Sequence, residues 1–84
     1  MRIDKYLKLT RVIKRRSVAK DLLDAGLVKV NEKRAKASTS LEINDVIEIT
    51  YGRKTITLKV LQIKEIVRKE ETTTLYQLLH ETVL

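Results

Sequence analysis

The sequence lacks cysteine, proline, phenylalanine and tryptophan, and only two of its 84 residues are glycine. Without cysteine, a disulfide scaffold and any thiolate metal site are excluded, and a reducing compartment is expected. Without phenylalanine and tryptophan, the core has to be built from Leu, Ile and Val. A chain of this length has room for one domain with a modest core, so we expect residues 1–84 to form a single domain.

Long hydrophobic runs and catalytic motifs are missing as well. The longest apolar runs span only a few residues, and charged residues follow the first methionine, so neither a membrane span nor a signal peptide is expected. His80 is the only histidine, and Ser17 has no nearby base. There is no glycine-rich phosphate loop and no metal-ligand cluster. We therefore expect a cytoplasmic protein that is not an enzyme and takes no metal, cofactor or small-molecule substrate.

Positive charge is concentrated in the first half of the chain. Residues 1–40 contain twelve Lys and Arg against four Asp and Glu, whereas residues 41–84 contain six against seven. A localised basic surface is typical of proteins that bind polyanions, and nucleic acid is favoured over an anionic membrane. The only aromatics are Tyr6, Tyr51 and Tyr76, and two of them fall on apolar faces. This scarcity favours recognition of folded RNA through shape and phosphates over stacking on single-stranded bases.

Two short amphipathic helices are predicted in the basic half. The first covers residues 2–9, and the second covers residues 17–25, with Ser17 as its N-cap. Gly26 ends the second helix, because glycine adopts the left-handed conformation without a Cβ penalty. The apolar side chains expected to pack between the two helices are Ile3, Leu7, Val18 and Leu22.

Short strands and a closing helix are predicted for the remainder. The strands are expected at residues 27–30, 34–37, 46–50 and 55–63. The last segment is predicted to be a helix that begins at one of the threonines 72–74 and carries the apolar stripe Leu75, Leu78, Leu79 and Val83. The predicted fold class is therefore α+β: two N-terminal helices packed on a small, mostly antiparallel sheet, plus a C-terminal helix.

The candidate binding residues are cations around the second helix and the turn that follows it. Lys14, Arg15 and Arg16 precede the helix, where free N–H groups attract anions and guanidinium groups can hold phosphate oxygens. Asp4 either orients one of the arginines by a salt bridge or is a simple helix N-terminal charge. The predicted RNA-binding residues are Arg2, Lys5, Lys8, Arg11, Lys14, Arg15, Arg16, Lys20, Lys33, Arg34 and Lys36.

The order of these motifs resembles the S4 RNA-binding domain, also known as the αL motif. The resemblance covers residues 1–50, which leaves residues 51–84 as an extension. Glu32 stands where the family usually has glycine, which leaves the type of that turn open. The segments that carry the resemblance are RIDKYL at 2–7, RRSVAK at 15–20, DAGLVKVN at 24–31 and NDVIEI at 44–49.

The small size and the KRAKAS segment at residues 33–38 resemble stand-alone S4 proteins. These include the heat-shock ribosome-associated S4 protein and, most similar, the P-site tRNA-stabilising factors of bacterial ribosome-associated quality control. The latter resemblance implies binding to an obstructed large ribosomal subunit, contacts to its rRNA and to peptidyl-tRNA, and cooperation with a nascent-chain tailing factor that adds alanine. It also implies RNA contacts for Arg2 and Arg16. Three alternatives stay open: recycling of aborted large subunits, a protein-interaction adaptor acting through the C-terminal helix, and a targeting subunit of an RNA-modifying enzyme.

Overall fold

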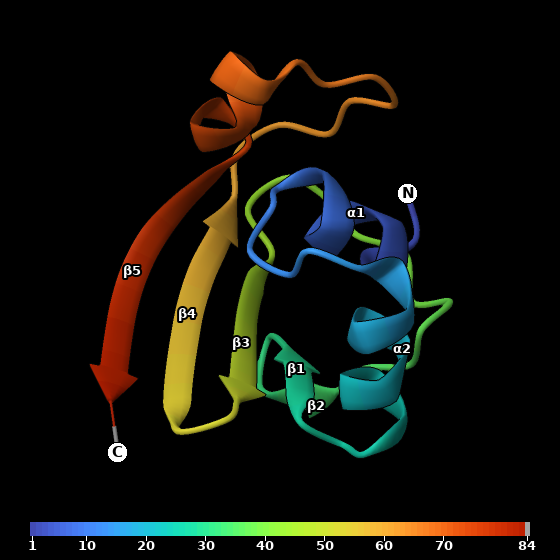
Figure 1. The fold of residues 1–84 in the computed structure, drawn as a ribbon, viewed down its shortest axis with the longest axis vertical. Coiled ribbons are helices and arrows are strands. Elements are labelled where there is room, and N and C mark those ends of the chain that lie inside the picture. Colours follow the sequence, from blue (N-terminus) through green and yellow to red (C-terminus); the bar gives the residue numbers. More distant parts are fainter. Residues whose placement is uncertain (84) are drawn as a thin grey trace.

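The computed structural model describes residues 1–83, in which two helices pack against an antiparallel sheet. The sheet has five strands in the order β2-β1-β3-β4-β5. Figure 1 shows α1 and α2 beside the β1 and β3 side of the sheet, with β5 farthest from them. The elements are α1 (Ile3–Leu9), α2 (Arg16–Asp24), β1 (Val28–Val30), β2 (Lys33–Arg34), β3 (Val46–Tyr51), β4 (Lys54–Val60), the 3-10 helix η1 (Lys69–Thr74) and β5 (Tyr76–Val83).

The core is aliphatic except for Tyr6 and lies between the helices and one face of the sheet. In β3, Ile47 and Ile49 are fully buried while Glu48 between them is partly exposed, so the strand predicted at residues 46–50 is confirmed and one of its faces points into the core. The predicted pair of N-terminal helices on an antiparallel sheet is also confirmed. On α2, however, Ala19 and Leu23 are buried, whereas Val18 and Leu22 are only partly buried. The apolar face of this helix is wide. The spacing of its apolar residues alone therefore does not show which of them point directly into the core.

The turn between β1 and β2 keeps the geometry that a glycine would favour. Asn31 and Glu32 have φ values of 50° and 71°, which is the pattern of a two-residue type I′ hairpin. The Asn31 side chain holds the turn in place: its Oδ1 accepts from the Val46 N–H at 3.0 Å, and its Nδ2 donates to Asp45 Oδ1 at 3.0 Å. Because the chain then leaves the sheet, β2 contains only Lys33 and Arg34 and is shorter than the predicted strand at 34–37.

The prediction of a C-terminal helix is wrong. Residues 76–83 form β5, which pairs with β4 in antiparallel register and continues the sheet. A helix of eight residues is marginal alone, whereas β4 has an open edge whose backbone groups β5 satisfies. Only η1, over Lys69–Thr74, is helical here, and Thr72 and Thr74 donate to backbone carbonyls within it. The register of β4 and β5 shifts between Thr57 and Leu58. This shift interrupts the alternation of apolar and polar residues along β5, so the sequence pattern does not indicate a strand there.

Candidate RNA-binding surface

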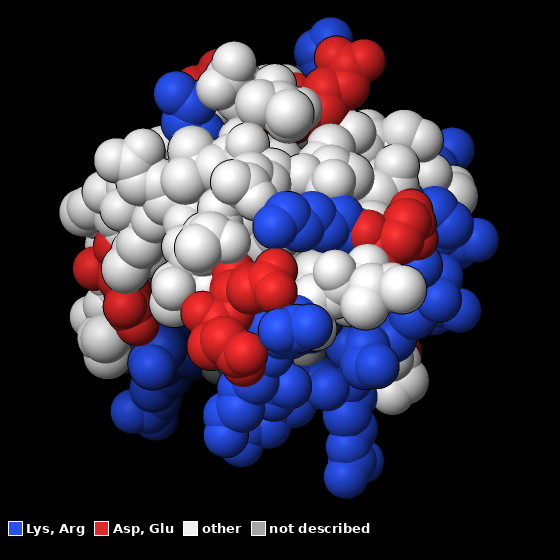
Figure 2. Space-filling model, turned by 90° about the horizontal axis from the view of Figure 1, so that it is seen from above, with Lys and Arg blue, Asp and Glu red and all other residues white. Residues whose placement is uncertain are grey.

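On the face that Figure 2 shows, most Lys and Arg side chains protrude along the lower and right-hand margins. Smaller charged groups lie at the top of that view, and much of its upper left is uncharged. The structure divides the predicted cations into two groups. One surrounds Asp4, and the other lies along the connection between α1 and α2.

The first group is organised by a buried carboxylate. Asp4 lies in the first turn of α1 and is fully buried. Its Oδ2 accepts from Arg2 Nη2 at 3.2 Å, and its Oδ1 accepts from Arg16 Nη2 at 3.3 Å. Arg16 Nε also lies 3.3 Å from Oδ2, and the Lys5 backbone N–H donates to Oδ1 at 2.8 Å. The salt-bridge interpretation of Asp4 is therefore confirmed, and the carboxylate joins the arginine that precedes α1 to the arginine that begins α2.

The charge of Asp4 is maintained by these contacts. Burial by itself raises the pKa of the Asp4 carboxyl. The hydrogen bonds from Arg16 and from the Lys5 backbone, together with the positive charges of Arg16 and Arg2, outweigh that effect. The pKa of Asp4 is consequently below its ordinary value. Asp4 stays ionised at neutral pH and holds both guanidinium groups at the surface.

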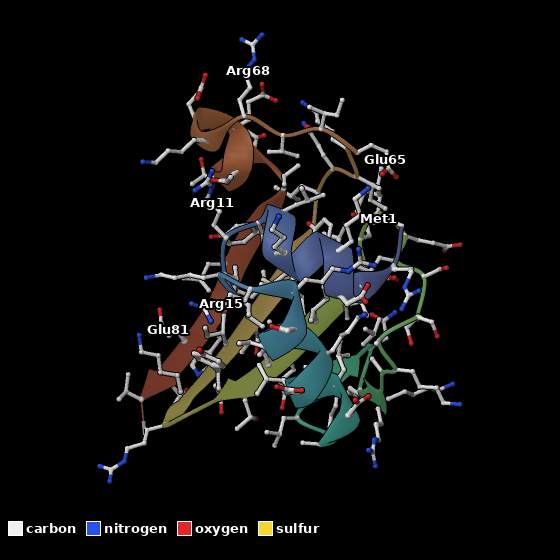
Figure 3. The ribbon with its side chains drawn as sticks, turned by 45° about the vertical axis from the view of Figure 1, so that its right-hand side comes forward. Met1, Arg11, Arg15, Glu65, Arg68 and Glu81 are labelled. Carbon is white, nitrogen blue, oxygen red and sulfur yellow. The ribbon has the colours of Figure 1, made fainter. Side chains whose placement is uncertain are left out.

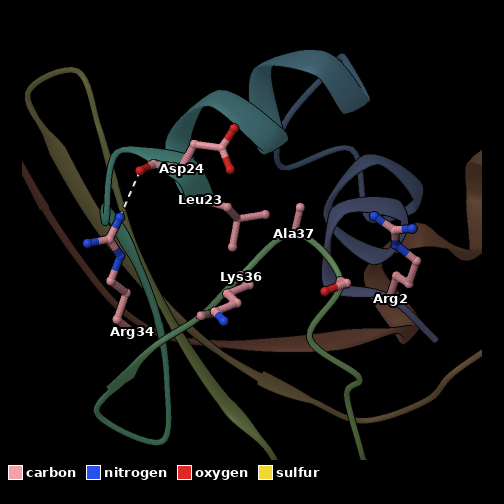
Figure 4. Close-up of a pocket in the computed structure, with 8 residues that line it drawn as sticks. Arg2, Leu23, Asp24, Arg34, Lys36 and Ala37 are labelled. Carbon is pink, nitrogen blue, oxygen red and sulfur yellow. Dashed lines mark hydrogen bonds between the residues drawn. The ribbon is translucent and has the colours of Figure 1, made fainter.

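A hollow beside this group is lined by further predicted cations. It measures about 520 Å³ and lies between the end of α2 and the segment Ala35–Ser38. Figure 4 shows Arg2 and Arg34 at opposite sides of it, with Leu23 between them. Lys36 also lines the hollow.

Arg34 has a structural role in addition to its charge. Its Nη2 donates to the Asp24 carbonyl at 2.8 Å and so satisfies the last turn of α2. Gly26, with a φ of 77°, lies directly under this side chain, because a Cβ there would be 3.1 Å from Arg34 Cζ. The predicted glycine stop is confirmed, and a second reason for glycine is the close approach of Arg34.

The second group of cations lies on the other side of the helix pair. Arg11, Lys14 and Arg15 line one hollow, and Lys8 lines a neighbouring one with Arg11 and Lys14. In Figure 3, Arg11 and Arg15 lie on the side toward β5, whereas Met1 lies on the opposite side. The run Lys14–Arg16 is therefore split between the two groups. α2 begins at Arg16, one residue before the expected Ser17 cap, and its N-cap residue makes no side-chain hydrogen bond.

The other predicted cations differ in how free they are. Lys5 forms an ion pair with Glu65 from the segment that follows β4. Lys20 is exposed on α2 one turn after Arg16, and Lys33 is exposed on β2. The sequence did not predict the ion pair between Lys5 and Glu65, which joins α1 to the C-terminal half of the chain.

Tyr51 is a residue of interest that the sequence pattern did not identify. It ends β3 and lines the same hollow as Arg11, Lys14 and Arg15. Strand alternation puts it on the face that carries Ile47 and Ile49, toward the helices. That alternation was the only signal in the sequence that could have found it.

Comparison with known proteins identifies the fold. The model of the S4 domain family matches residues 1–47. A protein of Streptococcus pneumoniae named RQC P-site tRNA stabilizing factor is 49% identical over 82 residues, which are 98% of this chain and 93% of the relative. The chain belongs to the S4 domain family. The protein of the same name from Bacillus subtilis is 39% identical over 84 residues, covering 100% of this chain and 98% of the relative.

A solved structure agrees with this assignment. Heat Shock Protein 15 of Vibrio cholerae, described as trimeric, superposes with a TM-score of 0.86 at 34% identity, covering 93% of this chain and 80% of that one. The S4 match contains Asp4 and both of its arginines. β4, η1 and β5 lie beyond it.

The described residues form neither a metal site nor a membrane-spanning helix. Within residues 1–83, no group of three or more His, Asp or Glu side chains is arranged to hold a metal ion. Over the same residues, no helix has the length and apolar character needed to cross a membrane.

Proposed function

We propose that this protein is a non-catalytic RNA-binding factor of ribosome-associated quality control that works in the cytoplasm. It binds the obstructed large ribosomal subunit, contacting rRNA and peptidyl-tRNA, and supports alanine tailing of the stalled chain by a nascent-chain tailing factor. The name shared by relatives up to 49% identical supports the ribosomal role. The S4 match over residues 1–47 supports RNA as the partner.

The observation that carries the proposal is the pair of arginines held by Asp4. Arg2 and Arg16 keep 49% and 41% of their side-chain surface exposed while the carboxylate between them is fully buried. A guanidinium fixed by one carboxylate loses less conformational freedom when it binds a phosphate oxygen. Lys20, Lys33, Lys36 and the α1–α2 cations extend the surface to neighbouring phosphates.

Arg16→Ala tests this assignment. Because a hydrogen bond to a charged group contributes about 1.5–3 kcal/mol, affinity for isolated large subunits should fall by tenfold or more. Lys64→Ala is a matched control: Lys64 is also ion-paired, to Glu71, and is 43% exposed, but it lies outside the surface. The control should bind nearly as tightly as the unaltered protein. Equal losses for the two variants, with both folded by circular dichroism, would show that only net charge matters.

Salt dependence and sedimentation test the wider proposal. If about six phosphates are contacted, the logarithm of the association constant should fall with the logarithm of salt at a slope of roughly −4 to −5. The protein should sediment with large subunits rather than with small subunits or whole ribosomes. Nuclease treatment should release it from a cell lysate complex. A complex that survives nuclease would indicate a protein-interaction adaptor, and co-purified modifying activity would indicate an enzyme subunit.

A further inference from the structure

The hollow between the α1–α2 connection and the end of β3 has the composition of a nucleotide site. It measures about 460 Å³ and is lined by Arg11, Val12, Lys14, Arg15, Val18 and Tyr51. We propose that it binds an unpaired nucleotide of the RNA, with the base stacked on Tyr51 and the flanking phosphates on the three cations. This inference rests on the proposed function and adds a second contact of a different kind.

Tyr51 is available for stacking. It is 43% exposed, whereas Tyr6 is fully buried and donates from its hydroxyl to the Leu75 carbonyl at 2.6 Å. Within residues 1–83 the Tyr51 hydroxyl makes no hydrogen bond that would fix the ring elsewhere. Val12 and Val18 are half-buried and supply apolar walls beside the ring. An aromatic ring with aliphatic neighbours accepts a base face of any sequence.

The cations of this hollow are free, unlike those at Asp4. Arg11, Lys14 and Arg15 form no ion pair within residues 1–83, whereas Arg2, Arg16 and Lys5 all do. Glu81 is the labelled acidic residue on this side in Figure 3, and it is paired with Lys54 at 3.6 Å. Three uncompensated positive charges around an aromatic ring favour a ligand that alternates anionic and flat apolar groups. A nucleotide chain has that alternation, and an acidic peptide has the anionic groups without an obligatory ring.

The volume and position fit one nucleotide rather than a duplex. Sites of about 300–1,000 Å³ hold small molecules, and the hollow falls within that range. Two residues that line it, Arg11 and Arg15, lie on the side toward β5 in Figure 3, whereas Met1 lies on the opposite side. None of the residues that line it forms an ion pair with Asp4. A stem bound at Asp4 and an unpaired nucleotide at Tyr51 are thus contacts to separate parts of one folded RNA.

The test compares two hairpin RNAs that share a stem and differ by a short 3′ single-stranded extension carrying 2-aminopurine. The unaltered protein should prefer the extended RNA, and the fluorescence of the 2-aminopurine should change on binding. Tyr51→Ala should lose most of this preference, roughly 5- to 100-fold, whereas Tyr51→Phe should keep it. Leu78→Ala, an exposed apolar residue of β5, is the control for general loss of apolar surface and should behave like the unaltered protein.

The outcomes separate this inference from the proposed function. Arg16→Ala should weaken the binding of both RNAs equally and leave the ratio of the two affinities unchanged. If Arg16→Ala instead binds both RNAs as tightly as the unaltered protein, that result counts against the proposed function and not against the nucleotide site. A preference for the extended RNA that Tyr51→Ala leaves intact, with the variant folded by circular dichroism, would overturn the nucleotide site. Competition by an oligoglutamate as strong as by an oligonucleotide of equal charge would also overturn it, because the hollow would then select anions without the base.

Discussion

Asp4→Asn is the substitution that bears most directly on the site. It keeps the volume of the side chain and removes its charge. In the folded protein the carboxylate accepts hydrogen bonds from Arg2, from Arg16 and from the Lys5 backbone. An amide has only one oxygen to accept hydrogen bonds. Its NH₂ group is a donor and would face a guanidinium, which is also only a donor. At least one arginine therefore loses its partner, and the buried amide is left with an unmatched donor.

The expected loss of stability follows from the exposure of the three groups. Removing one member of a fully buried ion pair costs about 3–5 kcal/mol. Here the carboxylate is buried, but the two guanidinium groups are 49% and 41% exposed, so water can solvate them after the change. We expect the free energy of unfolding to fall by about 1.5–3 kcal/mol, the range for hydrogen bonds to charged groups. For a domain of this size each kcal/mol lowers Tm by roughly 4–8 °C.

The effect should depend on pH in one direction. Because the pKa of Asp4 is lowered on folding, its contribution to stability is present above the ordinary carboxyl pKa of 3.8 and is lost as pH falls through the lower pKa of the folded protein. The stability difference between the unaltered protein and Asp4→Asn should therefore be full at neutral pH and shrink below about pH 4.

Urea unfolding followed by circular dichroism at several pH values measures this difference, and binding to large subunits is measured in parallel. Affinity should fall together with stability, because at least one arginine loses its fixed position. Asp21→Asn is the control, since Asp21 is exposed on α2 and forms no ion pair within residues 1–83. A difference that is the same at every pH, or affinity equal to that of the control, would refute the role assigned to Asp4.

Two further substitutions test the fold around the site. Glu32→Gly should raise the free energy of unfolding by about 0.5–1 kcal/mol, because Glu32 has a φ of 71° that glycine adopts without strain; Glu32→Gln, which removes only the charge, should not. Tyr6→Phe should lower the free energy of unfolding by about 0.5–1.5 kcal/mol, because the buried hydroxyl donates a hydrogen bond to the Leu75 carbonyl. This bond joins the two halves of the chain, and we propose that residues 1–84 unfold as one domain. A separate transition for residues 51–84 in calorimetry would contradict that proposal.

The elements near the N-terminus were predictable because local patterns and tertiary contacts agree there. The spacing of Ile3, Tyr6 and Leu7 predicts the buried face of α1, and all three are buried. Asp4 is different. The sequence allowed two interpretations of it, because its partner Arg16 is twelve residues away and reaches it only when α1 packs against α2. Contacts across a helix pair of this kind depend on packing that spacing alone does not determine.

The C-terminal segment was mispredicted because its local pattern fits two structures. Leu75, Leu78, Leu79 and Val83 follow helical spacing, and a threonine precedes them. The register with β4 shows another pattern, in which Tyr76 lies opposite Val60 and Leu78 opposite Leu58. Pairing to an open strand edge is a long-range contact, and it outweighs a weak local helical preference. The same limitation applies to Tyr51, whose neighbours in the hollow come from the distant α1–α2 connection.

Ion-paired and unpaired cations should affect RNA binding in different ways. Arg2 and Arg16 have little freedom, since each is held by a carboxylate that is itself fixed by burial and by a backbone N–H. A contact from a fixed guanidinium requires a phosphate at one position, so it sets the register of the RNA on the protein. Lys20 and Lys36 form no ion pair within residues 1–83 and can follow a phosphate as it moves. Loss of a free lysine should therefore lower the salt slope by about one unit with uniform weakening. Loss of the fixed pair should instead weaken binding and release the register of the RNA on the protein, an effect that added affinity elsewhere on the surface does not restore.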